Sequence, residues 1–389
     1  MQLSLLCAGL LATANLVFAA PTPSVTIDVN STELVTTTKS HWAPQFSPEF
    51  PGLKVTNPNP KYNSGPINTG TTLSKKTLDL SKYPKAWEVP SPNSAEVKAV
   101  INKINWDLVP KSPKRKAKNG DLDETGYDED KDPDCWWTAT LCTKPKVDYI
   151  PSDFYTCPTK GDWGLTYDDG PFVYSDDDDK TTQYENKWSE PELYNFLAKE
   201  DLKASLFYVG SNVIQYPEAA KRALNNGHTL CSHTWSHTTM TTLTNEQVVA
   251  ELYWSLKAIK DAAGVTTRCW RPPQGDVDDR VRAIAWQMGL HTVIWDEDTD
   301  DWAMPAPGGS NLPPEKVDAK FAKWIKNQQQ GKYKTGIMVL EHELNHATIQ
   351  MTEKWLPKVK QTFNVVSAMQ CNGVTQPYWE KSFEYPAIH

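Results

Sequence analysis

Apolar runs of strand length alternate with longer amphipathic stretches in this chain from about residue 160 onward. The runs predict seven β-strands, at residues 163–167, 205–209, 228–231, 268–271, 290–295, 337–340 and 365–368. Helix signals stand between them. Thr244 to Gln247 reads as a capping box, and Gly227, Gly264 and Gly289 stand where helices should end.

Strands that alternate with helices indicate an α/β fold with a parallel sheet. Seven consecutive βα units can close their sheet into a ring, so we expect a distorted (β/α) barrel of about seven parallel strands. An open, doubly wound sheet is the alternative.

Residues 20–130 have a different pattern. They are rich in Pro, Ser, Thr, Asn and Lys, and only residues 94–108 show apolar periodicity. This composition predicts an irregular extension with one short helix. The folded domain is expected to comprise residues 131–389.

The first 19 residues carry no charged side chain, and their apolar run ends in small residues at Ala19 and Ala20. This pattern predicts a secretory signal peptide over residues 1–19. A membrane anchor, the alternative, needs about 20 apolar residues, and this run is shorter. We therefore expect a secreted protein, extracellular or in the cell wall, without a membrane span. The sequon at Asn30 is compatible with that destination.

Cysteine usage agrees with secretion. Removing the signal peptide removes Cys7 and leaves six cysteines, an even number that predicts three disulfides in an oxidising compartment. Sequence alone leaves the pairing open. We favour Cys135 with Cys142 as a local loop, and Cys157 with Cys371 as a tie between the start and the end of the domain.

The net charge of −8 argues against nucleic acid or an anionic membrane as the main partner. Sixteen Trp and fifteen Tyr suit stacking on sugars, although ordinary packing explains most of them. The acidic run from Asp176 to Asp179 is typical of a solvated surface.

Polar residues follow the predicted strands. Asp168 and Asp169 follow the first, His233 and His237 the third, Arg271 the fourth, Asp298 the fifth and His342 the sixth. Each has an ordinary explanation by itself, because a lone His is usually hydrogen-bonded and an Asp pair before Gly-Pro is usually a turn. The carboxyl ends of barrel strands, however, meet at one rim, where active sites are built. Their joint position indicates a site.

His233 and His237 are four residues apart and can face one cation if the segment turns helically, with Asp169 as a third ligand. Three protein ligands and an open position are typical of a catalytic zinc site. Asp168 then remains free to accept a proton from water. Such a site would hydrolyse an acyl bond.

With these residues in place, the sequence resembles the NodB-like polysaccharide deacetylases of carbohydrate esterase family four. Five motifs stand in the order of that family: Thr166-Tyr167-Asp168-Asp169-Gly170-Pro171, His233-Thr234-Trp235-Ser236-His237, Arg271-Pro272-Pro273-Gln274-Gly275-Asp276, Asp298-Thr299-Asp300-Asp301-Trp302 and Leu340-Glu341-His342. The flanking stretch from Asp134 to Cys142 looks most like fungal chitin deacetylases. The resemblance covers roughly residues 131 to 370.

The resemblance implies a cofactor and a proton-transfer pair. The metal would be Zn²⁺, with Co²⁺ or another divalent transition metal as alternatives, held by the three ligands above. Asp168 would be the general base, positioned by Arg271. His342 would be the general acid, oriented by Asp298.

The resemblance also implies a substrate surface. Leu340 and Trp302 would line the pocket for the acetyl methyl group, and a backbone N–H near Gln274 would bind the oxyanion. The family usually has an aromatic residue where this chain has Gln274, so a sugar contact at this position is in question.

The implied function is metal-dependent removal of N-acetyl groups from chitin, giving chitosan and acetate, in the modification of a fungal cell wall. Acetylxylan and peptidoglycan are alternative substrates. Two other interpretations differ in kind: a wall-binding protein without catalysis, and a metalloprotease, because His342 to His346 matches the H-E-x-x-H signature.

Overall fold

The computed structural model describes residues 41–57, 73–74, 76–118, 121–172, 192–306 and 308–380. The predicted signal peptide, the sequon at Asn30 and the acidic run from Asp176 lie outside these residues. Within the described ranges, no helix combines the length and the apolar character that crossing a membrane requires.

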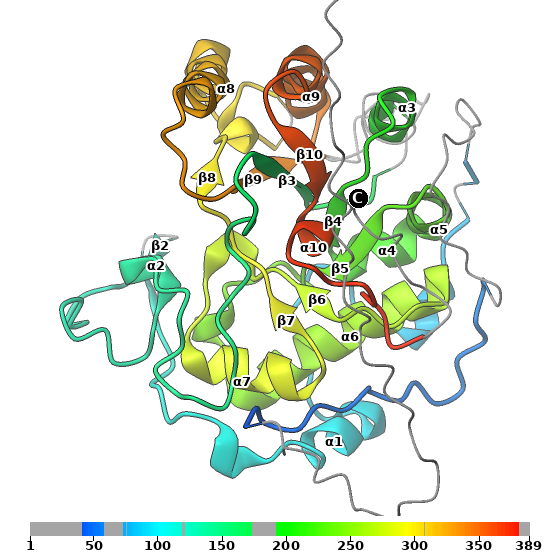
Figure 1. The fold of residues 1–389 in the computed structure, drawn as a ribbon. Coiled ribbons are helices and arrows are strands. Elements are labelled where there is room, and N and C mark those ends of the chain that lie inside the picture. The colour runs from blue at the N-terminus through cyan, green and yellow to red at the C-terminus, as the bar shows by residue number, and fades with distance from the viewer. Residues whose placement is uncertain are drawn as a thin grey trace, which may run out of the picture. The chain divides into compact units, whose positions relative to one another are not determined.

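A parallel sheet forms the centre of the fold (Figure 1). Its strands are β3 (Asp162–Asp168), β4 (Ser205–Tyr208), β5 (Thr229–Ser232), β6 (Cys269–Trp270), β7 (His291–Thr292), β8 (Glu297–Asp298), β9 (Ile337–His342) and β10 (Asn364–Ser367). The hydrogen-bonded order is β7-β6-β5-β4-β3-β9-β8. Each of the seven predicted strands is present, and β8 is an additional short one.

The strand order is that of a ring. Strands β3 to β7 follow chain order, and β9 returns to pair with β3 over six residues, Trp163 to Asp168. Among the described residues, no ladder joins β7 to β8, and β10 pairs only with the first half of β3. The curled sheet is therefore a distorted (β/α) barrel, as predicted, and not a doubly wound sheet, in which the strand order would reverse.

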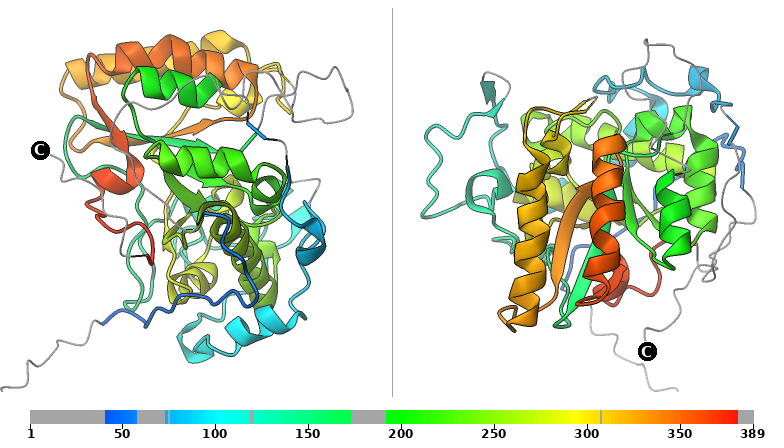
Figure 2. Two further views of the ribbon diagram at one scale, coloured as in Figure 1. Left: turned by 90° about the vertical axis from the view of Figure 1, so that its right-hand side faces the viewer. Right: turned by 90° about the horizontal axis from the view of Figure 1, so that it is seen from above.

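The helices cover the outside of this sheet. They are α3 (Glu192–Lys199), α4 (Gly210–Gln215), α5 (Pro217–Asn225), α6 (Asn245–Ala263), α7 (Asp279–Gln287), α8 (Pro314–Gln329), α9 (His346–Val359) and α10 (Ala368–Cys371). The capping box at Thr244 starts α6, and Gly264 ends it with φ 84°. Helices α8 and α9 lie side by side next to β9 (Figure 2).

The N-terminal extension packs on the barrel. It contains the helix α1 (Ala95–Ile101) and the 3₁₀ turns η1 (Leu80–Lys82) and η2 (Trp106–Leu108). It also contains two antiparallel strands of two residues each, β1 (Ala117–Lys118) and β2 (Asp121–Leu122). Its apolar side chains Leu78, Val97, Val100, Ile104 and Val109 are buried in the main hydrophobic core. Residues His41–His389 form one compact unit. The boundary at residue 130 stays a prediction.

Three disulfides join the six cysteines expected in the mature chain. Cys135 pairs with Cys142 and Cys157 with Cys371, which confirms the two favoured pairs. The third bond joins Cys231 of β5 to Cys269 of β6, so it links two neighbouring strands.

Candidate functional site

Asp168 is the last residue of β3, and its carboxylate is buried. Nη1 of Arg271 lies 2.7 Å from its Oδ1. The same nitrogen donates to Oγ1 of Thr166 at 2.9 Å, and the guanidinium lies 4.1 Å from the centre of the Phe207 ring. Burial lowers the pKa of Arg271, although the carboxylate opposes that effect. The guanidinium therefore fixes the position of Asp168 and neutralises its charge.

The next residue, Asp169, faces two imidazoles. Its Oδ1 lies 3.2 Å from Nε2 of His237 and 3.5 Å from Nε2 of His233. Nδ1 of His233 lies 2.8 Å from the carbonyl oxygen of Arg271. Because a carbonyl oxygen only accepts, Nδ1 of His233 donates this hydrogen bond, and Nε2 is the ring nitrogen left available to a metal ion.

These three side chains fit a divalent metal ion. Their ligand atoms all lie within 4.8 Å of one another. Oδ1 of Asp169 is buried and has no hydrogen-bond partner within the described chain. Burial would raise the pKa of Asp169, but His237 and His233 outweigh it and hold the pKa well below its usual range. Two imidazoles and one carboxylate are the donor set of catalytic zinc sites.

The loop that carries the two histidines is held from behind by Glu251 of α6. This buried carboxylate accepts hydrogen bonds from the main-chain N–H groups of Trp235 and Ser236, at 2.8 and 2.9 Å, and from the Ser236 hydroxyl at 2.5 Å. Thr234 and His237 both have positive φ, 64° and 56°. Sequence reasoning missed Glu251. An acid within the otherwise apolar stretch of α6 was the available signal.

His342 ends β9, and its orienting partner is Asp301. The Asp301 carboxylate accepts from the main-chain N–H of His342 at 2.9 Å, and its Oδ1 lies 2.7 Å from the ring Nδ1. The sequence predicted Asp298 for this role, whereas the residue that hydrogen-bonds to His342 in the structure is Asp301. Asp298 pairs with Leu340 in the β8–β9 ladder, two residues before His342. The 3₁₀ turn η5 (Asp301–Ala303) then brings Asp301 back beside the imidazole.

Asp301 and Asp298 differ in their effect on the imidazole of His342. Burial lowers the pKa of His342, but Asp301, together with Asp169 and Asp168, outweighs burial and raises the pKa to about 10. Burial, with Asp300 nearby, raises the pKa of Asp298 to about 6. Asp298 Oδ1 accepts from the N–H of Asp300 at 2.8 Å, so it makes a local turn.

The three residues predicted to bind substrate come from three segments. Leu340 lies in β9 and is buried, whereas Trp302 in η5 is 45% exposed. Gln274 is exposed at the centre of the 3₁₀ turn η4 (Pro273–Gly275), with φ 56°. Two hydrogen bonds close the turn, from the N–H of Gly275 to the carbonyl of Pro272 and from the N–H of Asp276 to the carbonyl of Pro273. The N–H of Gln274 takes part in neither of them.

The H-E-x-x-H pattern does not form a metal site. His342 belongs to β9, while His346 is the first residue of α9, and Asn345 between them caps that helix. A metalloprotease signature requires both histidines on one face of one helix. Among the described residues, the only cluster of His and carboxylate ligands is that of Asp169, His233 and His237.

Comparison with known proteins agrees with this geometry. Residues 156–293 match the family model of polysaccharide deacetylases. The chain is 43% identical over 311 residues to a chitin deacetylase of Amylomyces rouxii, covering 78% of this chain and 69% of that protein. It is 39% identical over 332 residues to chitin deacetylase 2 of Cryptococcus neoformans var. grubii, covering 82% of this chain and 69% of that protein.

A solved chitin deacetylase from Colletotrichum lindemuthianum is 22% identical, covers 62% of this chain and 98% of that one, and has a TM-score of 0.49. The assignment does not depend on that distant likeness. The family is shown by the two relatives above, because the alignments at 43% and 39% identity cover most of this chain and most of each relative. The protein belongs to the polysaccharide deacetylase family.

Proposed function

We propose that this protein removes N-acetyl groups from chitin in a metal-dependent hydrolysis that releases acetate and leaves free amines on the polymer. The observation that carries the proposal is the placement of a buried Asp168–Arg271 pair beside the cluster of Asp169, His233 and His237. Both of the more similar relatives above are named chitin deacetylases. The polymer is therefore the substrate class that we assign.

Asp169, His233 and His237 would hold the metal. A divalent cation bound there would polarise the acetyl carbonyl and lower the pKa of water. The mixed nitrogen and oxygen donor set favours Zn²⁺, with Co²⁺ or another divalent transition metal as the alternative.

The protein's own side chains divide the proton transfers. Asp168 accepts a proton from the attacking water, and Arg271 keeps its carboxylate in place for that transfer. His342 donates a proton to the amide nitrogen as the bond to the acetyl carbon breaks. Asp301 accepts a hydrogen bond from Nδ1–H of His342, so the other ring nitrogen, Nε2, would face the leaving amine.

The remaining residues would bind the acetyl group. Leu340 and Trp302 would contact its methyl, and the N–H of Gln274 would donate to the carbonyl oxygen as negative charge develops on it. The exposed side chain of Gln274 would lie at the edge of the sugar-binding surface.

We also propose that the protein is secreted and acts outside the cell or in the cell wall. The support is the apolar leader predicted over residues 1–19, together with three disulfides in the folded chain. Structural disulfides persist in oxidising compartments.

The test is acetate release from partly N-acetylated chitin by the purified protein, by the chelated protein, and after Zn²⁺ is returned. Release that is lost with the chelator and restored by Zn²⁺ supports the proposal. Faster release from acetylxylan or peptidoglycan would reassign the substrate. Binding to chitin with no acetate released would instead indicate a wall-binding protein.

A further inference from the structure

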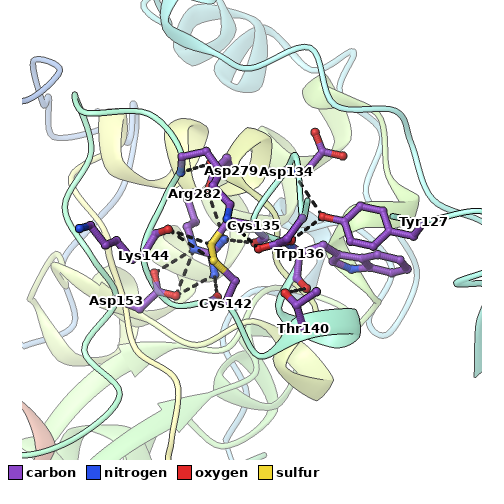
Figure 3. The surroundings of a disulfide bond; sticks show 12 residues. Tyr127, Asp134, Cys135, Trp136, Thr140, Cys142, Lys144, Asp153, Asp279 and Arg282 are labelled. Carbon is purple, nitrogen blue, oxygen red and sulfur yellow. Dashed lines mark hydrogen bonds and ion pairs between the residues drawn. A yellow bond between two sulfur atoms is a disulfide. The ribbon is translucent and has the colours of Figure 1, made fainter. Parts of the chain in front are cut away.

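A short disulfide-closed loop lies beside the candidate site. This disulfide loop, residues 135–142, contains the helical turn α2 (Trp137–Thr140) and precedes the residues that the family model matches. Both of its ends are held by Arg282 of α7, whose Nη1 donates to the carbonyl of Cys135 at 2.6 Å and whose Nη2 donates to that of Cys142 at 2.8 Å (Figure 3). Arg282 is itself buried and ion-paired with Asp153. The loop therefore has a fixed base.

Three consecutive residues of the disulfide loop bond to the segment just after Gln274. The indole Nε1 of Trp136 donates to Oδ1 of Asp276 at 2.9 Å, and the Thr138 hydroxyl donates to the same oxygen at 3.1 Å. The main-chain N–H of Trp137 donates to the carbonyl of Val277 at 3.0 Å. The loop and the segment that follows η4 are thus joined by both main-chain and side-chain bonds.

The ring of Trp137 packs directly on Gly275. A Cβ atom built on Gly275 would lie 2.2 Å from the nearest ring atom, so only glycine allows this approach. On another side the ring meets Trp295 edge-on, with 4.8 Å between centroids. Trp137 therefore fills the space between the turn and the barrel.

The turn needs such support because its backbone is unusual. Gln274 and Gly275 have φ of 56° and 70°, two successive left-handed residues of which one has a side chain. Such conformations persist where the surrounding structure over-determines them. The Trp137 ring and the bonds to Asp276 and Val277 supply that constraint from outside the turn.

We propose that Trp137, presented by the disulfide loop, is a positioning residue that holds the Pro273–Gly275 turn and so aims the N–H of Gln274 at the acetyl carbonyl. The inference rests on the proposed function for the contact between this turn and the substrate. A displacement of about 1 Å in such a contact can cost roughly 100-fold in rate. The disulfide loop then contributes to catalysis without touching the substrate.

The experiment compares Trp137→Ala with Trp137→Phe. We expect Trp137→Ala to lower kcat on partly acetylated chitin by about 100-fold, with KM and bound metal unchanged. Phe keeps an aromatic ring against Gly275 and should recover most of the rate. Leu141→Ala is the matched control, because Leu141 is in the same loop but is 66% exposed. It should retain the wild-type kcat.

Hydrogen exchange gives a readout that does not depend on activity. In Trp137→Ala, the amides of residues 274–278 should exchange faster, while those of β3 at residues 163–168 should not change. The double variant Cys135→Ser with Cys142→Ser should give the same pattern, and it serves if Trp137→Ala does not fold. An unchanged kcat, or exchange that rises equally in β3, would overturn the inference. A wild-type protein that releases no acetate would overturn the proposed function, while the exchange pattern would still test the positioning.

Discussion

Asp301 holds His342 at two points, the ring Nδ1 at 2.7 Å and the main-chain N–H at 2.9 Å. The first contact orients the imidazole, and the second ties the end of β9 to the turn that carries Asp301. One carboxylate therefore sets both the direction of the proposed general acid and its charge.

Replacing Asp301 with Asn should shift the pH dependence of the reaction. The negative carboxylate favours the imidazolium, so its loss lowers the pKa of His342, by about one unit or more. Because the proposed acid must be protonated, the alkaline limb of kcat/KM should move to lower pH. Acetate release measured across that limb checks the shift.

Asp298→Asn is the matched comparison for that experiment. Asp298 influences His342 only through its charge, whereas Asp301 also makes the hydrogen bond. Asp298→Asn should therefore move the alkaline limb of kcat/KM less than Asp301→Asn does. A larger movement in Asp298→Asn than in Asp301→Asn would return the orienting role to Asp298.

The two adjacent acids should separate under mutation. Asp168→Asn should lower turnover by about 10²- to 10⁴-fold, the contribution of a general base, while the protein keeps its metal. Asp169→Asn should lose metal, because it removes the carboxylate that faces both imidazoles. Metal content of the purified variants, measured beside acetate release, distinguishes the two. Equal metal loss in both would mean that the roles are misassigned.

Glu251→Gln should weaken metal binding without touching a ligand. Glu251 accepts three hydrogen bonds from Trp235 and Ser236, and an amide can accept only through its single oxygen. Loss of such a supporting partner typically costs about 10- to 100-fold in metal affinity. Competition with a chelator measures it. Glu246→Gln, at an exposed position on the same helix, should bind metal like the wild type.

Acid should destabilise the fold through His228, whose buried Nδ1 accepts from the N–H of Ala204 at 3.1 Å. Burial, with Lys203 nearby, lowers the pKa of His228 from 6.5 to about 3. Between these values the unfolded chain binds a proton that the folded chain does not. The contribution of His228 to the free energy of unfolding is therefore complete above pH 6.5. It is lost as the pH falls toward 3, by about 1.4 kcal/mol per pH unit.

Urea unfolding at several pH values tests that contribution. In His228→Asn an amide oxygen can replace Nδ1 as the acceptor but does not titrate in this range. The variant should therefore lose less stability than the wild type between pH 6 and about pH 4. The quantity to compare is the slope of unfolding free energy against pH, because the substitution also changes packing and so the absolute stability. Identical slopes in the two proteins would show that His228 is not responsible.

Residues at the strand ends could be placed together from the sequence. Asp168, His233, Arg271 and His342 each follow an apolar run, and parallel strands bring their carboxyl ends to one rim. No knowledge of the loops was needed for that inference. Cys135 and Cys142 were likewise close enough in the chain for their pairing to be favoured and then confirmed.

Choices between nearby residues needed the tertiary structure. Asp298 and Asp301 are three residues apart, and only the β8–β9 register and the following turn decide which one reaches His342. The bonds from Glu251 to the histidine loop, and from the disulfide loop to the segment after Gln274, join residues that are distant in the chain.

The sequence by itself determined the barrel and the residue types at its rim, because strand period and strand ends are local properties of the chain. Which of those side chains hydrogen-bond to one another was decided only in the folded protein. A hydrogen bond depends on atoms within about 3 Å. The path of each loop sets such distances, and that path is determined by packing against residues from other parts of the chain.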